Sequence, residues 1–385
     1  MRILVYLGGR ANYSSIKSVM EAFNNDDYFD LITVLGCSAV LEKFGDVSEL
    51  IKKDGFTINE KVYHLVEGDS PAVMAKTAAL GMLDASNILL KYSPDFVLIV
   101  GDRYEMMSFA LPAAYMNIRI IHTMGGEVTG TIDESIRHAL TKFSHIHFVA
   151  TNKAKENVLR MGEDDRFVFN VGCPRIDLVK KELENNSLTI LKEYFSINKG
   201  IGNDIDFDMP FILVSQHSVT TEHDLNREYI ESILKALKTF GMQCLVLWPN
   251  SDAGGNQISK GIRTFREHNT DVSFAFHKNL PNKIYIHLMN TCFCLLGNSS
   301  SGVREGGFIG TPVINIGTRQ NTRESGENVI HTDNSYDSIL KSLNSIKDLE
   351  DVHDELYGNG NTSEKIINIL KTLPELPSLQ KILKY

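Results

Sequence analysis

Short, continuous runs of apolar residues alternate with helical patterns along the whole chain, and this alternation constrains the fold most strongly. In the first half the apolar runs cover residues 3–7, 30–35, 96–100, 118–122 and 147–150. In the second half they cover residues 211–215, 243–248, 272–276, 293–297 and 313–316. Continuous apolar strands separated by helices are typical of parallel sheets that are covered on both faces. We therefore predict an α/β protein with two Rossmann-like, doubly wound domains.

The chain length and one polar segment suggest where these domains divide. The 385 residues exceed what a single hydrophobic core normally organises. Because the stretch 182–208 is polar and rich in glycine, we expect a linker between about Lys180 and Phe207. The predicted domains are residues 1–180 and 207–362, and a C-terminal helical segment, residues 363–385, can cross back to the first domain. Ligands of such sheets bind beyond the carboxyl ends of the strands.

Composition narrows the cellular setting and the partners. The formal net charge of −9 argues against nucleic acid as the main partner, because phosphate backbones require a basic face. No apolar run reaches the ~20 residues needed to cross a bilayer, and the first residues do not form a signal peptide. The five cysteines lack zinc-type pairing and are expected to be free thiols in a reducing compartment. We therefore expect a cytoplasmic protein without a membrane partner.

Two strand ends in the first domain carry polar groups with two possible roles. Gly8 and Gly9 precede Arg10 at a helix start, so this segment is either an ordinary turn or a phosphate clamp. Asp102 follows a fully apolar strand and is either a helix cap or an active-site carboxylate.

The segment between residues 122 and 138 is dense in ionisable groups. Glu127 follows a glycine pair, and Asp133 and Glu134 lie at a helix start, four residues or fewer before Arg137. Acidic residues in a first turn are often only caps. Carboxylates beside an arginine beyond a strand end also suit proton transfer.

The second domain contains the strongest local signal. His217 follows the first strand of that domain and is flanked by hydroxyl residues. A later strand leads into a turn of small residues and a helix, where Ser299, Ser300, Ser301 and Gly302 are expected to cradle a diphosphate. Glu305, about one turn further, is expected to reach a ribose. The glycine spacing does not match the GxGxxG fingerprint of dinucleotide sites.

Together these segments resemble the hydrolysing UDP-N-acetylglucosamine 2-epimerases, in particular the branch that feeds sialic-acid-type and legionaminic-acid-type sugars. The resemblance rests on residues 10–13, 101–103, 125–138, 217–221, 249–254, 297–300, 310–320 and 326–328. It implies a fold like that of the GT-B glycosyltransferases, with the active site in the cleft between the domains. It also implies that a nucleotide sugar is hydrolysed to a nucleoside diphosphate and a free 2-epimer through a 2-acetamidoglycal.

The resemblance also assigns roles to residues. It places Arg10, His217 and residues 300–302 on the diphosphate and Glu305 on the ribose. Asp102, Asp133 and Arg137 match catalytic positions, and we keep Glu127, Glu134 and His217 as further catalytic candidates. No cofactor and no metal is expected, and the family suggests a homodimer or a higher homo-oligomer.

The chain departs from the family pattern at Asn12, Ser15 and Met124, where relatives commonly have Asp, Lys and Glu. The methionine matters most, because it cannot carry a proton. It suggests either that this position is not the essential base or that the sugar differs from N-acetylglucosamine. A 2,4-diacetamido-2,4,6-trideoxy sugar linked to UDP or GDP is the alternative substrate. A GT-B glycosyltransferase and a non-catalytic nucleotide-sugar sensor remain the rival functions.

Overall fold

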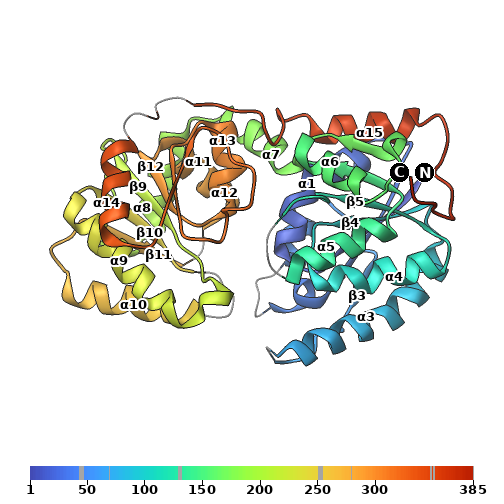
Figure 1. The fold of residues 1–385 in the computed structure, drawn as a ribbon, viewed down its shortest axis with the longest axis horizontal. Coiled ribbons are helices and arrows are strands. Elements are labelled where there is room, and N and C mark those ends of the chain that lie inside the picture. The colour runs from blue at the N-terminus through green and yellow to red at the C-terminus, as the bar shows by residue number, and fades with distance from the viewer. Residues whose placement is uncertain are drawn as a thin grey trace. The chain divides into compact units, whose positions relative to one another are not determined.

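The computed structural model describes residues 1–42, 47–68, 70–128, 132–249, 255–278, 280–346, 349 and 352–384. The chain forms two compact units, one of Met1–Leu178 with Gly358–Tyr385 and the other of Val179–Tyr357. Each unit has a seven-stranded sheet with helices on both faces (Figure 1). Two parallel-sheet α/β domains were predicted, and this fold class is confirmed.

In the first unit all neighbouring strands are parallel, in the order β3-β2-β1-β4-β5-β6-β7. The strands are β1 (Arg2–Leu7), β2 (Asp30–Gly36), β3 (Glu60–Val62), β4 (Phe96–Val100), β5 (Arg119–Thr123), β6 (Ile146–Val149) and β7 (Val168–Asn170). The helices are α1 (Arg10–Asn24), α2 (Val47–Lys53), α3 (Pro71–Tyr92), α4 (Met107–Tyr115), α5 (Ile132–Phe143), α6 (Asn152–Arg160), α7 (Pro174–Leu183) and α15 (Thr362–Thr372). The strand order reverses between β1 and β4, which is where such sheets bind ligands.

The second unit follows the same plan in the order β14-β13-β12-β9-β10-β11-β8. Its strands are β8 (Ile201–Gly202), β9 (Phe211–Ser215), β10 (Gln243–Leu247), β11 (Phe274–His277), β12 (Cys294–Gly297), β13 (Val313–Ile316) and β14 (Val329–Thr332), of which β8 alone pairs antiparallel. The helices are α8 (Ser187–Ile197), α9 (Asn226–Phe240), α10 (Gly255–His268), α11 (Asn282–Thr291), α12 (Ser300–Val303), α13 (Glu305–Ile309) and α14 (Tyr336–Ser345). Here the order reverses between β9 and β12.

The expected linker between Lys180 and Phe207 is not a linker. The unit boundary falls inside α7, and the polar stretch folds into α8 and β8 of the second unit. Buried Leu191 and Phe195 give α8 an apolar face that packs against Phe211 of β9. The polar residues of α8 lie on its outer face, which explains why composition alone suggested a linker.

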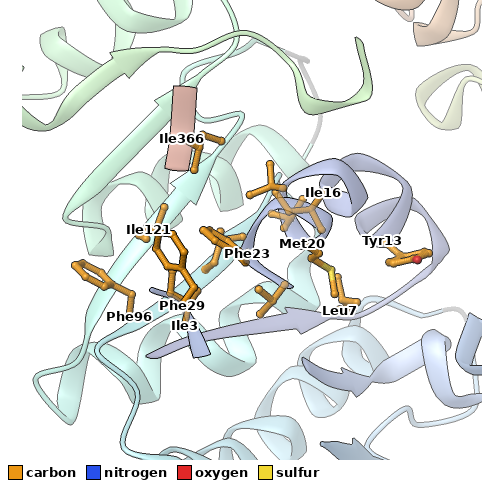
Figure 2. Close-up of a cluster of buried hydrophobic side chains, with 14 of the residues drawn as sticks. Ile3, Leu7, Tyr13, Ile16, Met20, Phe23, Phe29, Phe96, Ile121 and Ile366 are labelled. Atoms are coloured by element: carbon orange, nitrogen blue, oxygen red, sulfur yellow. The ribbon is translucent and has the colours of Figure 1, made fainter. Parts of the chain in front are cut away.

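The C-terminal segment belongs to the first unit. Ile366 of α15 lies in the same buried cluster as Ile3, Phe23 and Ile121, from β1, α1 and β5 (Figure 2). All five cysteines are buried and free.

Candidate functional site

The predicted polar residues of the first unit gather beyond β4 and β5. The Asp102 carboxylate is ion-paired with Nη2 of Arg137, which lies on α5. Nη1 of the same guanidinium donates to the main-chain carbonyl of Glu127 at 2.6 Å. The Arg137 side chain is 2% exposed and that of Asp102 is 25% exposed. A carboxylate that a buried cation holds in place, and that still reaches solvent, is suited to proton transfer.

Asp102 is not a helix cap. The following 3₁₀ turn, Tyr104–Met106, is capped by Arg103 without a side-chain hydrogen bond, and α4 begins without a side-chain cap. The carboxylate is directed to Arg137 instead, so of the two readings of Asp102 the structure disfavours the cap.

The backbone that carries Asp102 is fixed by β5. Gly101 has a positive φ of 74°, and its N–H donates to the Thr123 carbonyl at 3.1 Å. Nε2 of His122 donates to the Gly101 carbonyl at 2.7 Å. Burial lowers the pKa of His122 to about 4, so this imidazole is neutral at physiological pH. Both hydrogen bonds fix the turn that directs Asp102.

The other candidates of this unit lie on the same loop and helix. Glu127 is buried, and Asp133 and Glu134 occupy the first turn of α5, where Glu134 Oε1 lies 3.4 Å from His138 Nε2. Thr129, Gly130 and Thr131 of the predicted motif lie outside the described residues. Asp102, Glu127 and Arg137 are therefore joined directly, and α5 carries Asp133 one turn before Arg137.

Met124 is mostly buried and adopts a left-handed backbone conformation with φ of 64°. Its N–H donates to the Phe148 carbonyl at 2.9 Å. This conformation is unfavourable for a residue with a Cβ and is concentrated at functional sites.

Sequence reasoning overlooked Glu105, which is 2% exposed. A Cβ on Gly8 would lie 2.4 Å from Cγ of Glu105, so this carboxylate packs directly against the loop after β1. Its Oε2 is buried without a hydrogen-bond partner in the described part of the chain. Glu105 lies only three residues after Asp102, and this spacing could have marked it as a candidate in the sequence. Arg10 begins α1 next to this loop and is exposed.

In the second unit, the Asn298 side chain connects the loop after β12 to the loop after β9. Its side-chain Oδ1 accepts from the His217 N–H at 2.8 Å, and its Nδ2 donates to the His217 carbonyl at 2.9 Å. Asn298 is completely buried. Gly297 before it has φ of 140°, and a Cβ there would lie 2.2 Å from the Ser215 carbonyl oxygen. The Asn298 amide thus fixes the backbone of His217, a role that sequence reasoning did not assign.

Side-chain hydrogen bonds and close packing both shape the turn of small residues after β12, residues 299–302. Ser299 caps α12 and its Oγ lies 2.7 Å from Oγ of Ser301, which in turn lies 2.6 Å from the Tyr285 hydroxyl. A Cβ on Gly302 would lie 2.9 Å from Cγ1 of Val313, so glycine is needed there for close packing of α12 on β13. Ser299 and Ser300 are partly exposed.

One continuous helix after this turn was expected, and that expectation is wrong. The chain leaves the regular helix at Arg304, where ψ is −71°, so α12 has only four residues and Glu305 begins a second short helix, α13. Glu305 is 3% exposed. The segment Asn250–Gly254, part of the predicted motif at 249–254, lies outside the described residues.

Comparisons with known proteins identify the family of this chain. Residues 21–371 match the family described as UDP-N-acetylglucosamine 2-epimerase. The chain is 33% identical over 374 residues to a UDP-N,N'-diacetylbacillosamine 2-epimerase (hydrolyzing) from Legionella pneumophila, covering 97% of this chain and 96% of the relative. It is 30% identical to a GDP/UDP-N,N'-diacetylbacillosamine 2-epimerase (hydrolyzing) from Campylobacter jejuni, covering 89% and 88%.

Among solved structures, the UDP-GlcNAc 2-epimerase from Neisseria meningitidis bound to UDP-GlcNAc has a TM-score of 0.81 at 17% sequence identity. The match covers 96% of this chain and 100% of that one and shows a shared, GT-B-like fold. By its match over most of its length, the chain belongs to the UDP-N-acetylglucosamine 2-epimerase family.

Proposed function

We propose that the chain is a hydrolysing 2-epimerase that releases a nucleoside diphosphate and the free 2-epimer of a 2-acetamido sugar. The family establishes that the chain is a nucleotide-sugar 2-epimerase. We propose in addition that the reaction hydrolyses the nucleotide sugar. The observation that supports it most is the Asp102–Arg137 ion pair, which places a partly exposed carboxylate at the topological switch point of the first sheet.

The reaction that we propose has two steps. First, a carboxylate removes the proton on C2 of the sugar while the C1–O bond breaks and its electrons leave with the diphosphate, giving a 2-acetamidoglycal. Water then adds its hydroxyl to C1, and a proton is delivered to the opposite face of C2. Asp102 and Asp133 are our candidates for the proton transfers, with Glu127 and Glu134 as further candidates, and Arg137 orients Asp102.

The second unit holds the nucleotide in this proposal. Ser299 and Ser300 present partly exposed hydroxyls at the end of β12, beside the fixed backbone of His217. We propose that they contact the diphosphate together with His217, Ser301 and Gly302, that Glu305 binds the ribose, and that Arg10 of the first unit neutralises the phosphates. The location of the complete active site between the units remains a prediction.

For the sugar, we propose a UDP-linked 2,4-diacetamido-2,4,6-trideoxy hexose in preference to UDP-N-acetylglucosamine. The relatives from Legionella pneumophila and Campylobacter jejuni described above are both named for N,N'-diacetylbacillosamine. Buried Met124, in place of a carboxylate, gives the loop an apolar side chain suited to a methyl or acetamido group. The product would serve legionaminic-acid or sialic-acid synthesis in the cytoplasm, where five free buried thiols are stable.

Incubation with donor sugar alone tests the proposed function. A hydrolysing epimerase releases nucleoside diphosphate and free sugar without an acceptor, and in D₂O the product carries deuterium at C2. A glycosyltransferase requires an acceptor, and a sensor binds the donor without turnover. Comparing UDP- and GDP-linked forms of both sugars identifies the substrate. Release of nucleotide without inversion at C2 would contradict the proposal.

We also propose that the chain is a homodimer formed through α3. This helix lies at the edge of the first unit beside α4 (Figure 1). Among the described helices, α3 alone has the length and the apolar composition needed to cross a membrane. The sequence predicted no such helix. The inner face of α3 packs Ala85, Ile88 and Leu89 in the core. Its outer face exposes Leu80 and Leu83, by 46% and 68%.

Charges on this outer face favour a second copy over a membrane. Lys76 and Asp84 are exposed, four residues to either side of Leu80, and neither has an ion-pair partner within the described ranges. Two α3 helices that cross antiparallel about a two-fold axis at Leu80 bring Lys76 of one copy to Asp84 of the other. A bilayer interior would leave both charges unpaired.

A further inference from the structure

A lysine of the C-terminal segment caps the helix that carries the candidate catalytic residues. Nζ of Lys381 donates to the Lys142 carbonyl at 2.9 Å, to the Thr141 carbonyl at 3.4 Å and to the Ser144 carbonyl. These carbonyls lie in the last turn of α5 and directly after it, where helix carbonyls lack intrahelical partners. A positive charge there also interacts favourably with the helix dipole.

The lysine is held in this place by a buried carboxylate. Glu163 Oε2 lies 2.6 Å from Lys381 Nζ, and the Glu163 side chain is 3% exposed. The same carboxylate binds Lys142 at 2.6 Å and His147 at 3.1 Å. Burial alone would raise the pKa of Glu163, but its hydrogen bond to His147 and the nearby charges lower it to about 2. Glu163 is therefore a permanent counter-ion for Lys381.

The capped turn of α5 is linked to the candidate acid–base site by two side chains. Arg137, one turn before Thr141, is ion-paired with Asp102. Thr141 Oγ1 lies 3.2 Å from Nδ1 of His122, whose other ring nitrogen binds the carbonyl of Gly101. Movement of the end of α5 would therefore displace Arg137 and His122, the two side chains that hold the turn at Asp102.

We propose that Lys381 is a positioning residue for the acid–base site: it fixes the end of α5 so that Arg137 and His122 hold Asp102 in its reactive place. The proposal rests on the proposed function, because it assigns the reaction to Asp102. Lys381 itself does not touch the substrate. It is expected to affect the chemical step, and not the binding of the nucleotide, whose proposed ligands lie mainly in the second unit.

A second anchor of the same segment provides a matched control. Arg119 Nε donates to the Pro377 carbonyl at 2.8 Å. Within the described residues Arg119 forms no hydrogen bond or ion pair with α5 or with Glu163. If the C-terminal segment served only general stability, loss of Lys381 and loss of Arg119 would have similar consequences. If Lys381 positions α5, only its loss impairs turnover.

The experiment compares Lys381→Met, Lys381→Arg and Arg119→Met in the full-length protein. We expect Lys381→Met to lower kcat roughly tenfold to a hundredfold, the scale of a small misplacement of a catalytic group. KM should stay within about twofold, since nucleotide binding is not affected. Lys381→Arg should restore most of kcat, and Arg119→Met should keep it. If Lys381→Met does not fold, Lys381→Gln, which keeps a donor without the charge, replaces it.

Hydrogen exchange of the peptide that covers residues 132–144 gives a readout that does not depend on activity. Exchange should be at least about tenfold faster in Lys381→Met than in the native protein, and unchanged in Arg119→Met. An unchanged kcat and unchanged exchange, or equal losses in both variants, would overturn the proposal. Failure of the proposed function would look different: the native protein would not turn over any donor, while exchange would still report on α5.

Discussion

Arg137 binds the side chain of Asp102 and the main chain of Glu127 with the two ends of one guanidinium. A single buried cation thereby joins the loop after β4 to the loop after β5. Because Arg137 is 2% exposed, water competes little for the hydrogen bonds of its guanidinium, and the partly exposed Asp102 is held in a fixed position relative to α5. Substitution of Asp102 therefore tests whether this fixed carboxylate takes part in the reaction.

Asp102→Asn should lower turnover at least about a hundredfold, since acid–base groups contribute at least that much. The substitution keeps the shape of the side chain and removes its charge, and Arg137 retains the Glu127 carbonyl. Donor hydrolysis is measured beside a thermal melt. Asp95→Asn is the matched control, because Asp95 directly precedes β4 at the opposite edge of the sheet. Near-normal turnover in Asp102→Asn, or equal losses in both variants, would exclude a catalytic role.

Glu305→Gln should weaken binding of UDP by ~1–3 kcal/mol, the cost of a lost hydrogen bond to a charged group. Glu305 lies at the start of α13 and is 3% exposed, so the isosteric change limits damage to the fold. Calorimetric titration with UDP measures the effect. Glu228→Gln, an exposed glutamate in the first turn of α9, is the control. Equal affinity in native protein and Glu305→Gln would place the ribose elsewhere.

The strands could be predicted from sequence because each is a continuous apolar run, and the residues directly after them could be identified as candidates. The contacts of Asp102 could not, because Arg137 is 35 residues away and only the fold brings it close. The role of Asn298 could not be assigned from sequence, since its amide binds backbone atoms of a residue 81 positions earlier. Lys381 reads as an ordinary charge in a polar tail, and only its buried partner Glu163 distinguishes it.

Acidification should destabilise the first unit. Burial lowers the pKa of His122 and of His145 to about 4, from a usual value near 6.5. Between these values the unfolded chain binds protons that the folded chain excludes, so the free energy of unfolding falls as pH drops from about 6.5 towards 4. We expect a loss of roughly 1–2 kcal/mol per histidine between pH 7.5 and 5.

Urea unfolding at these two pH values, followed by circular dichroism, measures this loss. His145→Gln should reduce the dependence on pH, whereas His268→Gln, which removes an exposed histidine of α10, should not. A pH dependence that is the same in native protein and His145→Gln would show that His145 is not kept neutral by the fold.

The α3 interface predicts a specific pattern of charge reversal. Lys76→Glu and Asp84→Lys each place like charges opposite one another across the two-fold axis, and each should weaken the dimer. The double variant restores the pairing with the signs exchanged and should recover it. Light scattering after size-exclusion chromatography measures the oligomer. Single variants that remain dimeric, or a native protein that is monomeric or binds vesicles through α3, would refute this interface.

Met124 is expected to determine the choice of sugar. A methionine that packs on a methyl or acetamido group gains roughly 0.8 kcal/mol per buried CH₂. A hydroxyl left unpaired beside it costs ~1–3 kcal/mol. Both effects favour the 2,4-diacetamido-6-deoxy sugar over N-acetylglucosamine, by ~2–4 kcal/mol in kcat/KM. The positive φ of Met124 suggests that the fold holds the side chain of this residue in one direction at some cost in strain.

Measurement of kcat/KM for both donors, in native protein and in Met124→Glu, tests this role. The carboxylate can accept a hydrogen bond from a sugar hydroxyl, so the preference should move towards UDP-N-acetylglucosamine. Met124→Leu is the control, since leucine has the same unfavourable φ and remains apolar, and it should keep the native preference. If the native enzyme prefers UDP-N-acetylglucosamine and Met124→Glu leaves the ratio unchanged, Met124 serves only packing, because its chemistry then makes no difference to the sugar.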